Sequence, residues 1–154
     1  MKQSITLTVN GEVRTIDVDT ADILLDVLRQ KLGFKAPKFA CDTGTCGACT
    51  VLLNGKSVRS CMILAVEADG QKIETVEGFS RDKLTPLQES FVEHSSFQCG
   101  FCASGMTMVA MELLKDNPHP TEEEVKEAIA GNLCRCTGYH SIVQGILGAA
   151  RKLS

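Results

Sequence analysis

The chain has 154 residues with a formal net charge of −3, and 44% of its residues are hydrophobic while 23% are charged. A chain of this length can form one ordinary domain or two small ones. The nearly balanced charge argues against a nucleic-acid-binding protein, which would carry a basic patch or stripe. The longest apolar runs, such as Met62 to Val66, fall far short of the ~18 residues of a membrane helix, and residues 1–4 have no apolar signal core. We therefore expect a cytoplasmic globular protein without a membrane span.

The N-terminal part of the sequence predicts a small α+β domain. Residues 5–9 alternate apolar and polar side chains, Asn10-Gly11 is typical of a hairpin turn, and residues 12–18 continue as a second strand. A helix is expected from about Ala21, with Gly33 as its end. A hairpin followed by a helix that packs across a sheet indicates an α+β domain of the β-grasp kind.

A second hairpin is expected between two of the cysteines. Two short strands joined by the turn pair Asn54-Gly55 account for residues 50–60. In this register Cys49 lies opposite Ser60, so Cys61 returns to the neighbourhood of Cys49. The hairpin would therefore bring together two cysteines that are far apart in the sequence.

A last strand is expected over residues 72–76, and a polar link over residues 77–83. This places a domain boundary near residue 79. The chain is thus predicted to have two domains, residues 1–78 and residues 79–154.

Four short helices in a small bundle are predicted for the second domain. Capping boxes predict the first helix after Thr85, with Gln88 as its partner, and the third helix after Thr121, with Glu124 as its partner. Gly131 is expected to end the third helix as a C-cap.

The other two helices lie next to cysteines. Cys99 and Cys102 would sit at the start of the second helix, and Cys134 and Cys136 in the loop that leads into the fourth. Helix N-termini carry free N–H groups and a positive dipole end, which stabilise thiolates and an anionic cluster. The helical domain therefore offers a favourable electrostatic site for iron and sulfur.

The eight cysteines divide into two sets of four. The first set is Cys41, Cys46, Cys49 and Cys61, and the second set is Cys99, Cys102, Cys134 and Cys136. Without a sign of secretion, metal ligands are favoured over disulfides. The first set has the C-x4-C-x2-C spacing with a distant fourth cysteine that is typical of a plant-type [2Fe–2S] cluster, whereas structural zinc sites usually have close pairs in both halves. Spacing alone leaves iron–sulfur and zinc both open for the second set.

Three segments make the sequence recognisable, and they are Gly44-Thr-Cys-Gly-Ala-Cys-Thr50, Gln98-Cys-Gly-Phe-Cys-Ala-Ser-Gly-Met106 and Gly131-Asn-Leu-Cys-Arg-Cys-Thr-Gly-Tyr139. They closely resemble the iron–sulfur subunit of the molybdenum hydroxylases, the family of xanthine dehydrogenase, aldehyde oxidoreductase and carbon monoxide dehydrogenase. The resemblance follows the chain in order over nearly its whole length and includes all eight cysteines.

The resemblance implies a plant-ferredoxin-like domain followed by a four-helix domain, with one [2Fe–2S] cluster held by each set of cysteines. It also implies a hetero-oligomer, such as a dimer of heterotrimers. A large subunit would bind molybdopterin in its cytosine dinucleotide form, and a medium subunit would bind FAD. Electrons would pass from molybdenum to the second set, then to the first set and then to FAD. Gln98 and Cys136 would lie beside the pterin, although from the residue alone capping a helix or facing solvent is the favoured role of Gln98.

Two stretches depart from the pattern of the family. Ala103-Ser104 stands where the family often has Thr-Pro, and Ala40 stands where it often has glycine, preceded here by residues 36–39. Neither departure removes a cysteine.

Two other functions remain open from the sequence, a free-standing two-cluster ferredoxin and a zinc-stabilised interaction module. A permanent subunit should expose apolar patches around Cys136 and the Cys41 loop, whereas a soluble carrier should be charged there. No Ser-His-Asp pattern, phosphate-binding loop or acid pair stands out. The expected chemistry of this chain is therefore one-electron transfer without substrate binding.

Overall fold

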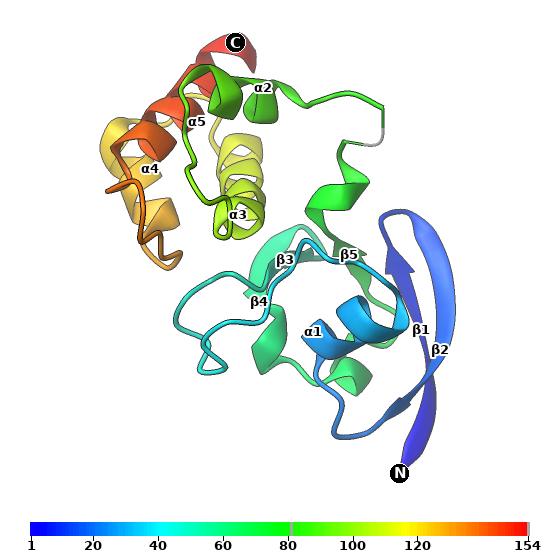
Figure 1. The fold of residues 1–154 in the computed structure, drawn as a ribbon. Helices are drawn as coiled ribbons and strands as arrows, with labels where there is room; N and C mark the ends of the chain where they lie inside the picture. Colours follow the sequence, from blue (N-terminus) through cyan, green and yellow to red (C-terminus); the bar gives the residue numbers. More distant parts are fainter. Residues whose placement is uncertain (81, 154) are drawn as a thin grey trace.

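The computed structural model describes residues 1–80 and 82–153, which form two units side by side (Figure 1). We call residues 1–78 the sheet unit and residues 85–153 the helical unit. The short connection between them runs along one side of the molecule, so the loops of the two units face each other across a junction (Figure 1). This mixture of a sheet and helices agrees with the α+β class predicted from the sequence.

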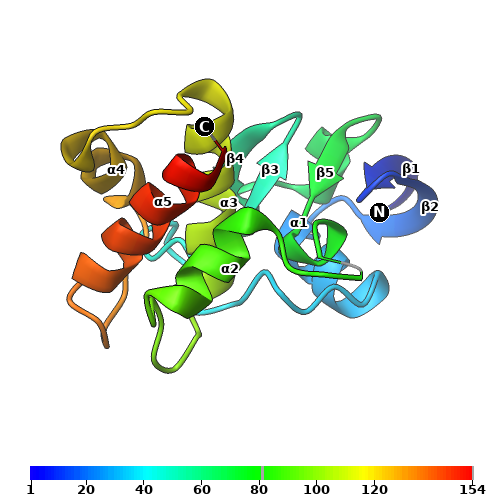
Figure 2. The same ribbon diagram turned by 90° about the horizontal axis from the view of Figure 1, so that it is seen from above.

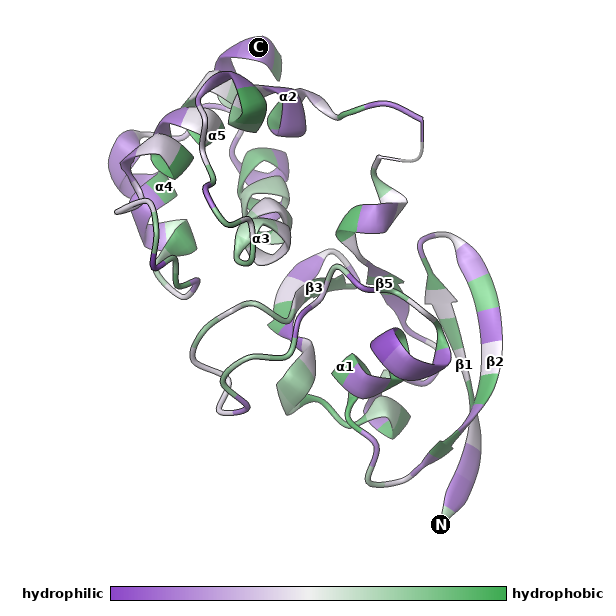
Figure 3. Ribbon diagram, viewed as in Figure 1, coloured by the Kyte–Doolittle hydropathy of each residue, from purple (hydrophilic) through white to green (hydrophobic). Residues whose placement is uncertain are grey.

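The sheet unit contains a five-stranded mixed sheet with the strand order β2-β1-β5-β3-β4. The strands in chain order are β1 (Lys2–Val9), β2 (Glu12–Asp19), β3 (Thr50–Leu53), β4 (Lys56–Arg59) and β5 (Lys72–Glu74). The two hairpins are antiparallel, and β5 lies parallel to β1 and antiparallel to β3. Hydrophilic and hydrophobic residues alternate along β1 and β2 because successive side chains point to opposite faces (Figure 3).

Both predicted hairpins are confirmed. Asn10 and Asn54 have φ of 51°, and the glycine that follows each has φ of 82°, which is the left-handed pair that a two-residue primed turn requires. In the second hairpin Leu53 lies opposite Lys56, as the predicted register demands. The strand predicted over residues 72–76 ends earlier, at Glu74, because Val76–Gly78 turns into a short 3-10 helix, η4.

The helix of the sheet unit begins later than the sequence suggests. Helix α1 (Leu24–Asp26) continues as a wider π-helical turn, η1 (Val27–Lys31), whereas the predicted start was near Ala21. Ile23 is extended because it forms a β-bridge with Leu64, which keeps the preceding residues out of the helix. Gly33 ends the helical segment with φ of +81°, as expected.

The core of the sheet unit lies between the sheet and this short helix. Its fully buried side chains include Ile5, Leu7, Leu24, Leu28 and Ile73, each at most 1% exposed. Two further 3-10 helices are η2 (Ser60–Met62), which contains Cys61, and η3 (Ala65–Ala68), whose Ala65 and Ala68 are buried in this core.

The helical unit consists of α2 (Pro86–Glu93), α3 (Ala103–Asp116), α4 (Glu122–Ile129) and α5 (His140–Leu153). Seen from above, α2 and α5 run beside each other, with α3 between them and the sheet (Figure 2). Both predicted capping boxes are present, at Thr85 with Gln88 and at Thr121 with Glu124. Across residues 1–80 and 82–153, every helix is too short or too polar to span a bilayer.

Gly131 does not have the expected role of a left-handed helix cap. Helix α4 ends instead in a tighter turn, in which the N–H of Asn132 donates to the carbonyl of Ile129 at 2.9 Å. A Cβ atom at this position would lie 2.5 Å from a guanidinium nitrogen of Arg59, so a larger residue would displace that side chain. This glycine thus leaves room for a contact across the junction.

Close packing of α5 against α2 requires glycine at two positions. A Cβ atom on Gly145 would lie 2.7 Å from the ring of Phe91, and one on Gly148 would lie 2.5 Å from the hydroxyl oxygen of Ser90. The Ser90 hydroxyl donates to the carbonyl of Gly145 at 2.6 Å, which only so close an approach of the two helices allows.

We expect the substitution Gly145→Val to lower the free energy of unfolding by about 1–3 kcal/mol, because the added methyl groups must push α2 away from α5. The matched control is Arg151→Val on an exposed position of the same helix. Chemical denaturation followed by circular dichroism measures both variants. Equal stability of the two variants would contradict the packing argument.

Candidate metal centres

The first set of cysteines lies in a loop whose backbone curls around their sulfur atoms. The N–H groups of Thr43 and Cys46 point to the sulfur of Cys41 at 3.5 and 3.4 Å, and the N–H of Ala48 points to the sulfur of Cys46 at 3.5 Å. Gly44 and Gly47 have φ of 75° and 77°, so the loop needs glycine to aim its amides inward. A ring of N–H donors of this kind stabilises thiolates.

Cys49 and Cys61 are the buried members of the first set, at 2% and 8% exposure. Their sulfur atoms lie 3.3 Å apart, because the hairpin returns Cys61 beside Cys49 as the sequence predicted. The hydroxyl of Ser60 donates to the carbonyl of Cys49 at 2.7 Å and holds the two chain segments together.

The thiols of the first set have unequal proton affinities. Hydrogen bonds from Thr43, Cys46 and Thr45, with the backbone N–H of Thr43 foremost, lower the pKa of Cys41 to about 5. Burial, reinforced by the neighbouring Cys49, raises the pKa of Cys61 to about 12. The partly exposed Cys41 is thus the more acidic thiol, whereas the buried Cys61 holds its proton more tightly.

The second set lies at the entrance to α3 and in the loop before α5. Cys102 is the N-cap residue of α3 and is buried, while Cys99 precedes the helix and is exposed. Cys136 is also exposed, and its sulfur lies 3.4 Å from that of Cys99. Helix α3 therefore begins at Ala103, and of the two cysteines predicted at its start only Cys102 belongs to its cap.

Burial and hydrogen bonds shift the pKa values of the second set in different directions. Desolvation, together with the nearby Cys134, raises the pKa of Cys102 to about 12. The N–H of Phe101 and the contact with Cys136 lower the pKa of Cys99, and the same contact raises the pKa of Cys136.

Cys134 is held by Thr137 and Tyr139, which follow shortly after the cysteine pair. The hydroxyl of Thr137 lies 3.1 Å from the Cys134 sulfur, and the hydroxyl of Tyr139 accepts the N–H of Cys134 at 3.0 Å. Tyr139 adopts φ of 72°, a conformation that is costly for a residue with a side chain. This hydrogen bond helps to hold the loop in that conformation.

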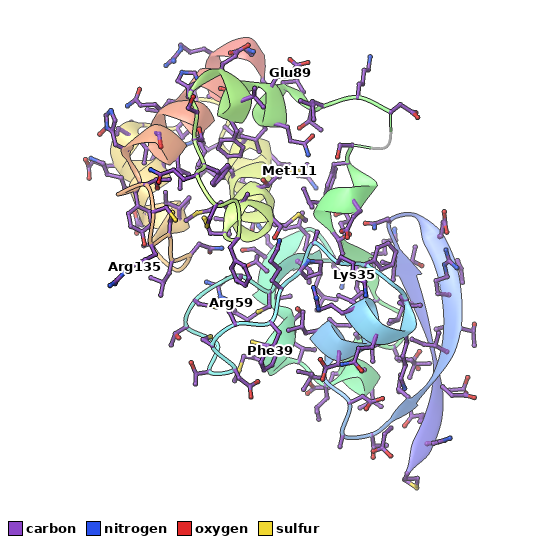
Figure 4. The ribbon with its side chains drawn as sticks, in the orientation of Figure 1. Lys35, Phe39, Arg59, Glu89, Met111 and Arg135 are labelled. Atoms are coloured by element: carbon purple, nitrogen blue, oxygen red, sulfur yellow. The ribbon has the colours of Figure 1, made fainter. Side chains whose placement is uncertain are left out.

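The second set opens onto the surface of the molecule. Gln98, Arg135 and the two exposed cysteines lie on it, together with the half-exposed side chains of Phe101 and Leu133. Figure 4 shows Arg135 pointing away from the helical unit. Gln98 is thus exposed next to Cys99.

In each set two sulfur atoms lie close together, Cys49 with Cys61 and Cys99 with Cys136. This pairing fits a two-iron cluster. All eight cysteines are free thiols. Within residues 1–80 and 82–153, no three His, Cys, Asp or Glu side chains converge on a point that would hold a single metal ion. In a tetrahedral zinc site all four sulfurs would lie about 3.8 Å from one another, given Zn–S bonds of ~2.3 Å. The donor set and the inward N–H groups suit a [2Fe–2S] cluster, in which each iron takes two cysteines.

One hydrogen bond connects the two loops that carry the two sets of cysteines. The N–H of Leu133 donates to the carbonyl of Cys46 at 2.8 Å, and Leu133 is covalently followed by Cys134. A ligand-bearing segment of the sheet unit is therefore bonded to a ligand-bearing segment of the helical unit.

Two side chains fasten this contact. The buried amide of Asn132 donates to the carbonyl of Gly47 at 3.1 Å. Arg59 donates to the Thr50 hydroxyl at 3.0 Å and to the Gly131 carbonyl at 2.6 Å. Its Nε is buried and has no hydrogen-bond partner in the described structure, a cost that the other two bonds offset. Figure 4 shows Arg59 at the junction of the two units.

A third contact across the junction involves Glu112 of α3. Its carboxylate accepts the N–H of Ser57 at 2.7 Å and lies 3.3 Å from the ammonium of Lys56. Burial alone would raise the pKa of Glu112, but the hydrogen bonds from Ser57 and the charge of Lys56 outweigh it and hold the pKa below its usual value.

Sequence reasoning missed Arg59 and Asn132, which join the units, and Tyr139, which holds the loop of Cys134. Gly47 and Gly105 are a sequence signal for this junction, because a Cβ atom on Gly105 would collide with the carbonyl oxygen of Gly47. Glycines near cysteines of different sets indicate that another chain segment comes close. The sequence does not tell that these two glycines face each other.

Comparison with known proteins identifies two matching families. Residues 7–78 match the 2Fe-2S iron-sulfur cluster binding domain, and residues 75–147 match the [2Fe-2S] binding domain. The fold and the two sets of cysteines thus define a protein with two 2Fe-2S-binding domains.

Relatives of nearly the same length show to which group of proteins with 2Fe-2S-binding domains this chain is similar. The chain is 52% identical to the nicotine 6-hydroxylase small subunit of Paenarthrobacter nicotinovorans, over 92% of this chain and 86% of that protein. It is 47% identical to the nicotinate dehydrogenase small FeS subunit of Eubacterium barkeri, over 92% and 90%. A chain of the crystal structure of quinoline 2-oxidoreductase from Pseudomonas putida 86 superposes with a TM-score of 0.94 at 45% identity, covering 97% of this chain and 94% of that one. The chain belongs to the iron–sulfur subunits of the molybdenum hydroxylase family.

We expect Arg59→Met to loosen the junction, because Gly131 and Thr50 lose their charged donor while the side-chain volume is nearly kept. The free energy of unfolding should fall by about 1–3 kcal/mol, and amide hydrogen exchange should accelerate in residues 46–50 and 131–134. The control is Arg14→Met, whose side chain pairs with Glu12 on the distant strand β2. Unchanged exchange in both segments would show that Arg59 does not fasten the units.

Proposed function

We propose that this chain is the electron-transfer subunit of a molybdenum hydroxylase complex. Electrons enter at the second set from the molybdopterin site of a large subunit, pass to the first set and leave to the FAD of a medium subunit. The observation that carries this proposal is the hydrogen bond from the Leu133 N–H to the Cys46 carbonyl, which joins the two sets by a short bonded route.

In this proposal each set of four cysteines holds one [2Fe–2S] cluster, and the clusters supply one-electron redox chemistry. Residues 1–78 form a β-grasp, plant-ferredoxin-like domain, and residues 79–154 form a four-helix domain. The inward N–H groups of the Cys41 loop and the N-terminus of α3 offset the negative charge of the thiolates. The residues of this chain therefore bind and orient the redox groups and shield them from water.

We assign the two ends of the relay to their partners from the side chains that are exposed there. Cys99 and Cys136 face outward with Gln98 beside them, so we assign this end to the pterin and Gln98 and Cys136 to contacts with it. Phe39 and Met62, at 50% and 60% exposure, surround the loop of the first set, and we assign that side to the flavin subunit.

The exposed apolar side chains favour a permanent subunit over a free-standing ferredoxin. Phe101 and Leu133 are 46% and 56% exposed beside the second set, and Phe39 is exposed beside the first. A soluble carrier would expose charge at these positions, whereas a hetero-oligomer, such as a dimer of heterotrimers, would cover them. Its eight free thiols suit a cytoplasmic complex.

The names of the relatives point to a substrate class for the whole complex. The three relatives reported above are named for nicotine, nicotinate and quinoline, which are N-heterocycles. We propose that the large subunit of the present complex hydroxylates an N-heteroaromatic compound and holds molybdopterin in its cytosine dinucleotide form. Identification of the co-purifying large subunit tests both points.

Metal analysis of the anaerobically purified protein should find two irons and two acid-labile sulfides for each set of cysteines. Cys41→Ser should remove one of the two EPR signals of the reduced protein and Cys99→Ser the other, so each variant serves as the control for the other. A colourless protein containing zinc would overturn the redox function.

In the intact complex, Cys136→Ser should lower turnover severalfold or more while the EPR signal of the first set stays intact, because electrons enter through the second set. Steady-state assays and EPR on the same preparation measure both. Undiminished turnover would contradict the proposed order of transfer.

Purification from the native source separates the subunit from the carrier. A subunit should elute with a molybdenum-containing and a flavin-containing chain, because its exposed apolar side chains are covered in the complex. Elution as a lone species of 16.6 kDa would support the free-standing ferredoxin instead.

A further inference from the structure

The two stretches that depart from the family pattern contact each other across the junction. The hydroxyl of Ser104 donates to the carbonyl of Ala36 at 2.7 Å. The ammonium of Lys38 donates to the same carbonyl at 3.2 Å and to the Ser104 hydroxyl at 3.4 Å. Residues far apart in the sequence thus hold one lysine in a defined place.

The Lys38 ammonium also lies over an aromatic ring in the loop between two cysteines of the second set. It is 5.7 Å from the centre of the Phe101 ring, and Phe101 stands between Cys99 and Cys102. A cation at this distance from a ring face is attracted to it, which adds to the two hydrogen bonds. A lysine from the segment that leads to the first set therefore places its charge against the loop of the second.

This charge is not neutralised by a carboxylate. Lys38 takes part in none of the ion pairs found within residues 1–80 and 82–153. The side chain is half-buried in a cleft of about 330 Å³ between the units, lined also by Phe97, Gly100 and Ser104. Partial removal from water strengthens the influence of a charge on its neighbours.

Arg59, another cation at the junction, is placed differently. Its hydrogen bonds go to the Thr50 hydroxyl and the Gly131 carbonyl, and neither residue stands between two cysteines of the second set. Arg59 fastens the units, whereas Lys38 touches the Cys99–Cys102 loop itself.

We propose that Lys38 raises the reduction potential of the second set relative to that of the first, and so sets how electrons distribute between them. The inference rests on the proposed function. One-electron reduction of a cluster adds one negative charge and breaks no bond. A fixed cation nearby stabilises the reduced state and makes the electron harder to remove. Lys38 thus acts on the potential at which electrons enter the second set, and not as a ligand of the cluster.

The test is a potentiometric titration of the cluster-loaded protein, followed by EPR, with the two signals assigned by the Cys41→Ser and Cys99→Ser variants. Lys38→Met removes the charge and keeps the length of the side chain. At a fixed potential, it should lower the reduced-to-oxidised ratio of the second set by about tenfold, which is 59 mV for a one-electron couple. The first set should shift less.

Three further variants separate charge from structure. Lys38→Arg keeps the cation over Phe101 and should keep the potential. Ser104→Ala removes the hydroxyl contact but not the charge, so its shift should be smaller than that of Lys38→Met. Lys35→Met removes a cation from the same segment whose ammonium bonds to the Arg29 carbonyl, away from the junction, and should leave the second set unchanged.

The outcomes distinguish this inference from the proposed function. An unchanged second-set potential in Lys38→Met, with both signals present, would overturn the role of Lys38 and leave the electron-transfer function intact. An equal shift in Ser104→Ala and Lys38→Met would also overturn it, because packing rather than charge would then be the cause. Absence of both EPR signals from the native protein would instead overturn the proposed function.

Discussion

The contact between the two cysteine loops is the constraint on which the rest of this structure depends. The Cys46 carbonyl accepts the N–H of Leu133, and the Gly47 carbonyl beside it accepts the Asn132 amide. For these bonds to form, Gly47 and Gly105 must both lack a Cβ atom, and α3 must lie against β3. A hydrogen bond therefore joins the two cysteine-bearing loops at the point where the two units meet.

Each unit contributes a different device for holding thiolates. The sheet unit curls a glycine-containing loop so that its N–H groups point at the Cys41 and Cys46 sulfurs. The helical unit uses the start of α3 and the hydroxyl groups of Thr137 and Tyr139. In both units one end of the set is buried and the other is more open. The inner cysteines are therefore shielded from water while the outer ones stay accessible.

Local rules predicted those parts of the fold that local interactions decide. The Asn-Gly hairpins and the capping boxes at Thr85 and Thr121 form as expected, because a few neighbouring residues satisfy their own backbone groups. The predictions were wrong where a distant residue intervenes. Ile23 leaves the helix because of Leu64, and Gly131 leaves room for Arg59. The domain boundary near residue 79 and the ligand sets remain predictions.

The sequence by itself determined that eight cysteines divide into two sets and that a hairpin returns Cys61 to Cys49, since both follow from spacing and from a two-residue turn. The three motifs around the cysteines also determined the family. Only the tertiary structure decided that the two sets are hydrogen-bonded to each other, that Arg59 and Asn132 fasten them, and that Lys38 rests on Phe101. These contacts join residues more than 60 positions apart in the chain. Local periodicity and spacing do not predict these contacts, because the contacts result from how two separately packed cores meet.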